Sequence, residues 1–347
     1  MNEATYEAPA NIALIKYWGL RDEALVLPYN PSLSVTLDRV RSRTRVVFDP
    51  KVREDELVMN GVVDHGSPRK AVSALLDRIR TEAGRSDHAR VTSSNNIPTA
   101  SGMASSASGF AALAGAGAYA AGLRLSPQRL SQLARFGSGS ACRSLFGGFV
   151  EWRAGTREDG GDCYARAVLP ESHWPEFRDV AVLVADAVPK KRRSARAMQF
   201  SIRTAPGYAA RIEAVPRRLA ELRRALRRKD PERLFPLIME ECDEFREICE
   251  TTRPAFDYLT DTSRRVLTAV REINEEAGHY VAAYTHDAGA HVHVFTLEPD
   301  HARVHRILGR VPGVAELRTL RPGPGGHLIT GRAGPSFSSS AANGVAP

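Results

Sequence analysis

The sequence is poor in cysteine, which excludes several specialised classes of protein. Its 347 residues include four cysteines, with no Cys-x-x-Cys pair and no spacing typical of a metal site. So few thiols exclude a small scaffold built on disulfides, and they suit the reducing cytoplasm. We expect Cys142, Cys163, Cys242 and Cys249 to behave as small buried apolar side chains.

Long apolar runs are also absent. The most apolar stretch, residues 110–123, is mostly Ala and Gly and is too short to cross a bilayer, so a buried helix is the better interpretation. The N-terminus is acidic and polar, without the basic start and apolar run of a signal peptide. No repeat of 20–50 residues is visible. These absences favour a cytoplasmic protein with no membrane segment.

Aromatic residues are scarce, whereas basic residues are in excess. Lys and Arg number 48 against 40 Asp and Glu, which gives a net charge of +8, and aromatic residues make up 7%. The excess positive charge favours anionic ligands such as nucleotides and phosphorylated metabolites, although a general coding preference for arginine would produce it too. Nucleic-acid binding is disfavoured because basic side chains are not interleaved with many aromatic ones.

Helical and strand patterns are mixed along the chain without regular alternation. Apolar runs predict strands at residues 46–49, 56–59, 89–92, 180–184, 280–284 and 291–297, and an Asn-Gly pair predicts a hairpin turn after residue 59. Apolar spacing predicts helices at 71–79, 110–123, 208–227, 231–249 and 262–277, and Ser126-Pro127 begins another. The order predicts an α+β fold rather than a doubly wound sheet. Residues 333–347 lack periodicity and predict a disordered tail.

A loop of small residues leads into the apolar helix and has the character of an anion site. Residues 93–102 are predicted as the loop, and the segment Pro-Thr-Ala-Ser-Gly-Met-Ala-Ser-Ser-Ala begins within it. Backbone N–H groups there can approach a phosphate, and the helix N-terminus favours negative charge. The candidate ATP contacts are Pro98, Gly102, Met103, Ala104, Ser105 and Ser106, and Ser106 is also a candidate Mg²⁺ ligand. The Gly-Lys-Ser/Thr ending of a Walker A loop is absent, and close helix packing is the structural alternative.

The same segment resembles the ATP-binding signature of the GHMP kinase superfamily, and three further segments narrow the resemblance. These are APANIALIKYWG at 8–19, GSGSACRSL at 137–145 and AYTHDAG at 283–289. Together they resemble the mevalonate diphosphate decarboxylases, from residue 8 to about residue 330. The resemblance implies a two-lobed GHMP kinase-like fold. The N-terminal lobe (1–178) would be like domain 2 of ribosomal protein S5, and the C-terminal lobe (179–332) would be ferredoxin-like.

The resemblance also implies a reaction and its cofactors. A homodimeric enzyme would use ATP and Mg²⁺ to phosphorylate the 3-hydroxyl of (R)-5-diphosphomevalonate. Loss of phosphate and CO₂ would then leave isopentenyl diphosphate. The matched catalytic residues are Asp287, which would orient or deprotonate the hydroxyl, Lys16, which would pair with Asp287, and Arg143, which would hold the substrate carboxylate. Lys16 also lies in an apolar strand-like run, an uncommon place for a cation unless it is paired.

Other matched positions would bind the two substrates. Those for the phosphorylated mevalonate are Tyr17, Trp18, Gly19, Leu20, Ser138, Gly139, Ser140, Ala141, Cys142, Arg143, Ser194 and Ala195. Ser93 and Asn96 occupy positions where the family holds the nucleotide.

Some positions depart from the family pattern. Leu20 stands where the family has a lysine for the terminal phosphate, and Ala195 stands where a polar or basic residue is common. Both changes remove donors for a second phosphate, so 5-phosphomevalonate, giving isopentenyl phosphate, is the alternative substrate. Arg21, Arg193 or Arg196 could restore the charge from a neighbouring position, and His291 in place of asparagine has no explanation in the sequence. A kinase without decarboxylation and a non-catalytic anion- or RNA-binding protein are weaker alternatives.

Overall fold

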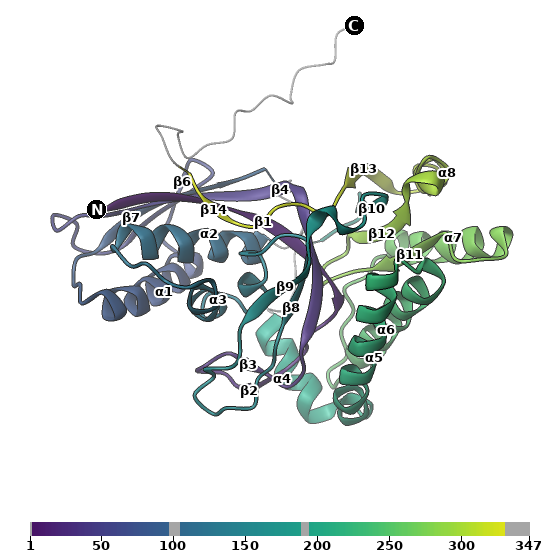
Figure 1. Cartoon of the computed structure of the whole chain (residues 1–347), viewed down its shortest axis with the longest axis horizontal. Coiled ribbons are helices and arrows are strands. Elements are labelled where there is room, and N and C mark those ends of the chain that lie inside the picture. Colours follow the sequence, from purple (N-terminus) through teal and green to yellow (C-terminus); the bar gives the residue numbers. More distant parts are fainter. Residues whose placement is uncertain (1, 97–104, 189–193, 330–347) are drawn as a thin grey trace, which may run out of the picture.

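The computed structural model describes residues 2–96, 105–188 and 194–329, which form two large sheets flanked by helices and a small two-stranded sheet of β2 and β3 (Figure 1). The strands are β1 (Glu3–Ile15), β2 (Leu20–Asp22), β3 (Leu27–Pro28), β4 (Ser32–Phe48), β5 (Glu56–Met59), β6 (Val62–Asp64), β7 (Ala89–Asn95), β8 (Phe149–Trp152), β9 (Ala165–Leu169), β10 (Phe177–Val184), β11 (Ala282–Thr285), β12 (Val292–Leu297), β13 (Val314–Leu320) and β14 (His327–Leu328). The helices are α1 (Ser67–Ala83), α2 (Ser105–Ala120), α3 (Pro127–Arg135), α4 (Ser194–Thr204), α5 (Tyr208–Arg228), α6 (Pro231–Thr251), α7 (Asp261–Ala277) and α8 (Glu298–Leu308), with 3₁₀ turns η1 (Gly139–Cys142) and η2 (Glu171–His173).

The N-terminal half is built on two unusually long strands. β1 and β4 pair antiparallel within a sheet of order β14-β1-β4-β7-β5-β6. β8 pairs with the first residues of β4, and β9 pairs with β8. Helices α1, α2 and α3 lie on one side of this sheet (Figure 1). The register of β1 shifts twice, between Pro9 and Asn11 and between Ala13 and Ile15. Such irregularities re-aim side chains, so they set the direction of the residues at the end of β1.

The small-residue helix packs as the sequence predicts. α2 is buried against β1 and α1, and its glycines permit close approach, because a Cβ on Gly115 would lie 2.4 Å from the ring of Tyr6. Gly117 meets Ile79 in the same way. Close packing therefore accounts for the composition of the body of the helix, away from its first turn.

The C-terminal half is an antiparallel sheet of order β11-β12-β10-β13. Val180, Val182, Val292 and Val294 on one face pack against α7 and α8. Phe177, Ala181 and Phe295 on the other face join α5, α6 and the ends of β1 and β4 in one core. This core joins the two halves and fixes the end of β1 against the C-terminal sheet.

Most of the predicted elements are confirmed, and the α+β fold class is confirmed as well. Ser126 caps α3 by accepting from the Arg129 N–H, and the Asn60-Gly61 hairpin joins β5 to β6. The predicted loop start was wrong, because residues 93–95 continue β7 by pairing with β4.

The tail 333–347 lies outside the described residues. In the described part of the chain, every helix is too short or too polar to span a bilayer.

Candidate active site

Lys16 and Asp287 meet where β1 ends beside the loop that follows β11. Lys16 Nζ donates to Asp287 Oδ1 at 2.9 Å and to the carbonyl of Ala13 at 2.7 Å. The lysine side chain is 4% exposed and the aspartate side chain 35% exposed. The ammonium is therefore buried in the core, whereas the carboxylate is partly exposed to solvent. Within the described residues, Asp287 Oδ2 has no hydrogen-bond partner. One carboxylate oxygen is thus engaged and the other is available to a ligand.

The carboxyl group of Asp287 is held in its ionised form. Partial burial opposes ionisation, but the Lys16 ammonium and its hydrogen bond outweigh burial, with help from Arg143 and His293, and lower the pKa of Asp287. The Arg143 guanidinium is therefore close enough to act on this carboxylate. The structure brings together the three residues that the sequence singled out as catalytic.

Arg143 follows the 3₁₀ turn η1 and points into a polar cage. Its Nε donates to Asn11 Oδ1 at 3.1 Å and to Ser34 Oγ at 3.0 Å, and its Nη1 donates to Ser32 Oγ at 2.6 Å. No acidic side chain in the described part of the chain forms an ion pair with this guanidinium, which is 2% exposed. A buried cation held only by neutral groups is suited to an anionic ligand.

Asn11, Ser32 and Ser34 were not predicted from the sequence. Asn11 also donates to the Ser140 carbonyl at 3.2 Å and to Ser144 Oγ at 2.8 Å, so it joins β1 to the loop around η1. A polar residue buried within an apolar strand was the available signal. The same signal, applied to Lys16 alone, identified one residue of this strand and missed the other.

The loop 138–142 forms one wall beside Tyr17. Ser138 and Ser140 share a hydrogen bond between their hydroxyls at 3.2 Å, and a Cβ on Gly139 would lie 2.8 Å from Tyr17 Oη. Burial raises the pKa of Tyr17 to about 12, so its hydroxyl is neutral and can donate. The side chains of Ala141 and Cys142 are fully buried, which leaves the serines and backbone groups to face a ligand.

The remaining predicted substrate positions lie around α4. Trp18 is 3% exposed, donates to Ser201 Oγ at 3.0 Å and packs against Phe245, so its side chain belongs to the core. Gly19 follows with a φ of +111°, and Leu20 is half-buried at the start of β2. Ser194 and Ala195 begin α4, the first half-buried and the second exposed.

Two arginines considered as replacements for a missing phosphate donor have other partners. Arg21 donates to the carbonyl of Arg157 at 3.1 Å, and the Arg196 guanidinium lies over the ring of Phe200 at 5.8 Å. His291, unexplained by the sequence, accepts from the Val184 N–H at 3.1 Å through Nδ1. Burial lowers the pKa of His291 to about 4, so the ring is neutral and ties the loop before β12 to the end of β10.

The candidate nucleotide residues are described only in part. Pro98, Gly102, Met103 and Ala104 lie outside the described residues, and α2 begins at Ser105 with Ser106 exposed in its first turn. Ser93 Oγ bonds Thr44 Oγ1 at 2.9 Å, and Asn96 binds the Arg39 carbonyl at 2.6 Å and the Arg41 N–H at 2.8 Å. Both side chains therefore stabilise β4 through hydrogen bonds. Their assignment as nucleotide contacts stays a prediction.

A helix N-terminus with an exposed serine suits a magnesium nucleotide. Mg²⁺ needs few protein ligands when phosphate oxygens and water complete its shell. The described residues contain no cluster of three His, Cys, Asp or Glu side chains able to hold a metal.

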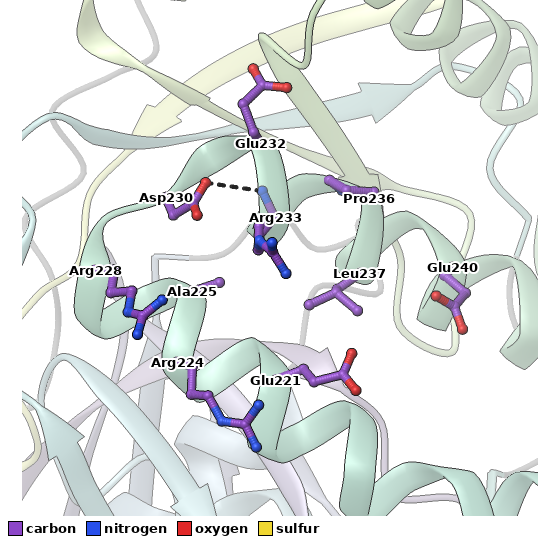
Figure 2. A pocket seen from close by; sticks show the side chains of 10 residues that line it. All are labelled: Glu221, Arg224, Ala225, Arg228, Asp230, Glu232, Arg233, Pro236, Leu237 and Glu240. Carbon is purple, nitrogen blue, oxygen red and sulfur yellow. Dashed lines mark hydrogen bonds between the residues drawn. The ribbon is translucent and has the colours of Figure 1, made fainter.

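A hollow of about 690 Å³ lies elsewhere, on the outer side of α5 and α6 (Figure 2). Its lining mixes acidic and basic side chains and includes Arg224, Arg233 and Glu240. None of the candidate site residues lines this hollow. With charges of both signs, it has no preference for an anionic substrate and is separate from the candidate active site.

Comparison with known proteins identifies the family of this chain. A diphosphomevalonate decarboxylase-like N-terminal domain matches residues 8–165, and a mevalonate 5-diphosphate decarboxylase C-terminal domain matches residues 180–319. The diphosphomevalonate decarboxylase of Bos taurus is 45% identical over 312 residues, covering 85% of this chain and 76% of the relative.

Solved structures agree over nearly the whole chain. Mevalonate diphosphate decarboxylase from Staphylococcus aureus superposes with a TM-score of 0.89 at 33% identity, covering 95% of this chain and 98% of the other. A structure of MDDEF in complex with MVAPP, AMPPCP and magnesium gives 0.87 at 35% identity, with coverages of 94% and 98%. The chain therefore belongs to the diphosphomevalonate decarboxylase family.

Proposed function

We propose that this enzyme catalyses the ATP-dependent decarboxylation of (R)-5-diphosphomevalonate to isopentenyl diphosphate, with ADP, phosphate and CO₂ as the other products. The observation that carries the proposal is that a lysine-paired carboxylate, Asp287, lies near a buried guanidinium, Arg143, which forms no ion pair with any acidic side chain among the described residues. The named relatives support the same reaction.

Phosphoryl transfer to a tertiary alcohol depends mainly on position and charge neutralisation. Asp287 Oδ2 is free to accept a hydrogen bond from the 3-hydroxyl, while Oδ1 is held by Lys16. The lowered pKa of Asp287 makes it a weak base, so its main work is to orient the hydroxyl and to take the proton as the new O–P bond forms. The Lys16 ammonium keeps that carboxylate ionised beside the incoming phosphate.

Decarboxylation requires that the substrate carboxylate be held and then released. Arg143 presents a planar fork that matches a carboxylate, and Asn11, Ser32 and Ser34 fix its direction. The Asp287 side chain is 35% exposed, so it can pass the hydroxyl proton on to solvent after phosphoryl transfer and become a carboxylate again. When the C3–O bond then breaks and phosphate leaves, positive charge develops at C3, and the Asp287 carboxylate stabilises that charge. The C1–C2 electron pair then forms the alkene as CO₂ leaves.

ATP is the phosphoryl donor, and the exposed Ser106 at the start of α2 would face its phosphates. Mg²⁺ on those phosphates would neutralise charge during transfer. A related structure with AMPPCP and magnesium supports both assignments.

The substrate's phosphate count is tested by direct comparison. Purified enzyme would be given 5-phosphomevalonate or its diphosphate with ATP and Mg²⁺, and CO₂ and ADP would be measured. We expect a higher kcat/KM with the diphosphate. A preference for the monophosphate would assign the alternative substrate and would fit the loss of donors at Leu20 and Ala195. ADP without CO₂ from either compound would indicate a kinase. Absence of ATP turnover with steeply salt-dependent RNA affinity would indicate a binding protein.

Three further assignments are part of the proposal. A homodimer is expected from the family and is checked by light scattering. A cytoplasmic location is supported by four free, buried cysteines. The lobes of residues 1–178 and 179–332 are supported by domain matches that end at 165 and begin again at 180, and limited proteolysis would test the boundary.

A further inference from the structure

Buried polar side chains form hydrogen bonds with both the N–H and the carbonyl of Lys16. Its N–H donates to Glu241 Oε1 at 2.9 Å, and its carbonyl accepts from Asn30 Nδ2 at 2.8 Å and from Arg211 Nη2 at 3.2 Å. These bonds fix the peptide groups on either side of the Cα from which the ammonium reaches Asp287. None of these contacts belongs to the side-chain chemistry described above.

Glu241 and Arg211 form a fully buried ion pair. Arg211 Nη2 donates to Glu241 Oε1 at 2.5 Å, and both side chains are 0% exposed. Arg218 Nη1 donates to the second oxygen, Glu241 Oε2, at 2.6 Å. A buried ion pair is expensive to desolvate, and an apolar pair of similar volume is often as stable. Stability alone is therefore a weak reason for these charges to be here.

The helix that carries Glu241 also contacts the other half of the catalytic pair. On α6, Phe245 packs against the ring of His286 with centroids 5.6 Å apart. His286 Nδ1 donates to the carbonyl of Asp287 at 2.8 Å. One helix thus supports the Lys16 backbone directly and the Asp287 backbone through one intervening ring.

We propose that Glu241 is a positioning residue for the decarboxylase reaction: with Arg211, it fixes the Lys16 peptide so that the ammonium meets Asp287 Oδ1. The inference rests on the proposed function, because it assigns a role in placing that site's ion pair. Displacement of a reacting group by about 1 Å can lower a rate about a hundredfold. Loss of the hydrogen bond from the Lys16 N–H to Glu241 should therefore lower the rate, although Glu241 does not contact the substrate.

The same network contains a matched control. Glu244 Oε2 accepts from Arg211 Nη1 and from Arg218 Nη1, each at 2.5 Å, but it has no bond to Lys16. Replacing either glutamate by glutamine removes one negative charge from the same two arginines. Only the change at position 241 alters a side chain that bonds directly to Lys16.

The test compares E241Q with E244Q in the full-length enzyme. We expect E241Q to lower kcat about ten- to a hundredfold with KM values for both substrates within about twofold. The acid limb of the kcat–pH profile of E241Q should move to higher pH, because a Lys16 ammonium that is held less firmly stabilises the Asp287 carboxylate less. E244Q should keep the wild-type kcat within about twofold and the wild-type limb.

The outcomes separate this inference from the proposed function. Equal kcat and equal acid limbs for E241Q and E244Q would overturn the positioning role and leave a purely structural ion pair. If E241Q does not fold, E241D retains the charge and retracts the carboxylate from the Lys16 N–H, and the same split is expected. Absence of CO₂ release from the wild type would instead refute the proposed function.

Discussion

Lys16 and Asp287 form a 2.9 Å ion pair although 271 residues separate them along the chain. The pair exists because β1 ends against the sheet that contains β11, in the core shared by the two halves. Ionisation of the carboxylate therefore depends on the docking of one half on the other.

Removal of the ammonium tests this dependence. In Lys16→Met, burial acts on Asp287 with one opposing charge fewer, so the pKa of Asp287 should rise. Protonation then occurs at higher pH, and the acid limb of the kcat profile should shift upward while kcat falls about a hundredfold or more at neutral pH. Lys70→Met, at an exposed position on α1, removes the same charge and should change neither. An unmoved limb in Lys16→Met would contradict the electrostatic role.

Gly19 is required by the contact between the Trp18–Gly19 segment and α5. Tyr208 Oη donates to the Trp18 carbonyl at 2.7 Å. Gly19 has a φ of +111°, and a Cβ on it would lie 1.9 Å from Tyr208 Oη. Gly19→Ala should lower the free energy of unfolding by about 3 kcal/mol, from backbone strain and overpacking together.

Gly61→Ala separates the two causes. Gly61 also has a positive φ, +83°, but nothing lies within 4 Å of its Cβ position. Only the backbone term applies, so a loss of about 1 kcal/mol is expected in urea unfolding. Equal losses at the two sites would show that the Tyr208 contact is unimportant.

His286 should make stability depend on pH. Burial first, and then Lys16, lower the pKa of His286 to about 4, well below the value of about 6.5 for an unfolded chain. As pH falls below 6.5, the unfolded state takes up a proton that the folded state refuses, so stability falls until about pH 4. At pH 5 the cost is about 2 kcal/mol relative to pH 7.

A variant without a titrating ring isolates this contribution. His286→Phe should remove about 2 kcal/mol from the difference in unfolding free energy between pH 7 and pH 5, measured by urea titration. His279→Phe, at an exposed position, should leave the difference unchanged. A wild-type slope in His286→Phe would mean that His286 is protonated in the folded protein.

The sequence was most informative where one face of an element is buried. α1 buries Val72, Leu75, Leu76 and Ile79 on one stripe, and its apolar spacing predicted it. Of β1, only the strand-like run around Lys16 was noticed and no bounds were predicted, because the strand is buried at every position from Tyr6 to Ile15 and has no alternation to detect. α8 was also missed, since it buries only Val304 and Leu308 among many polar residues.

The site was predicted unevenly for a related reason. Lys16, Arg143 and Asp287 were identified by their resemblance to family motifs, and the structure brings them together. Glu241 and Arg211 were not identified, because they lie in helices rich in charged residues. The sequence of α5 does not distinguish the buried Arg211 from the exposed Arg217, and only the docking of β1 on these helices separates them.

The central claim is that Asp287 directs phosphoryl transfer to the substrate hydroxyl, which must precede loss of CO₂. The most direct test measures ADP and CO₂ together from 5-diphosphomevalonate and ATP, with the wild type and Asp287→Asn. We predict one ADP per CO₂ for the wild type. For the variant, both products should fall together by a factor of about 10³ or more, with ATP affinity within about threefold of the wild type. A variant that retains near-normal release of both products would contradict the account.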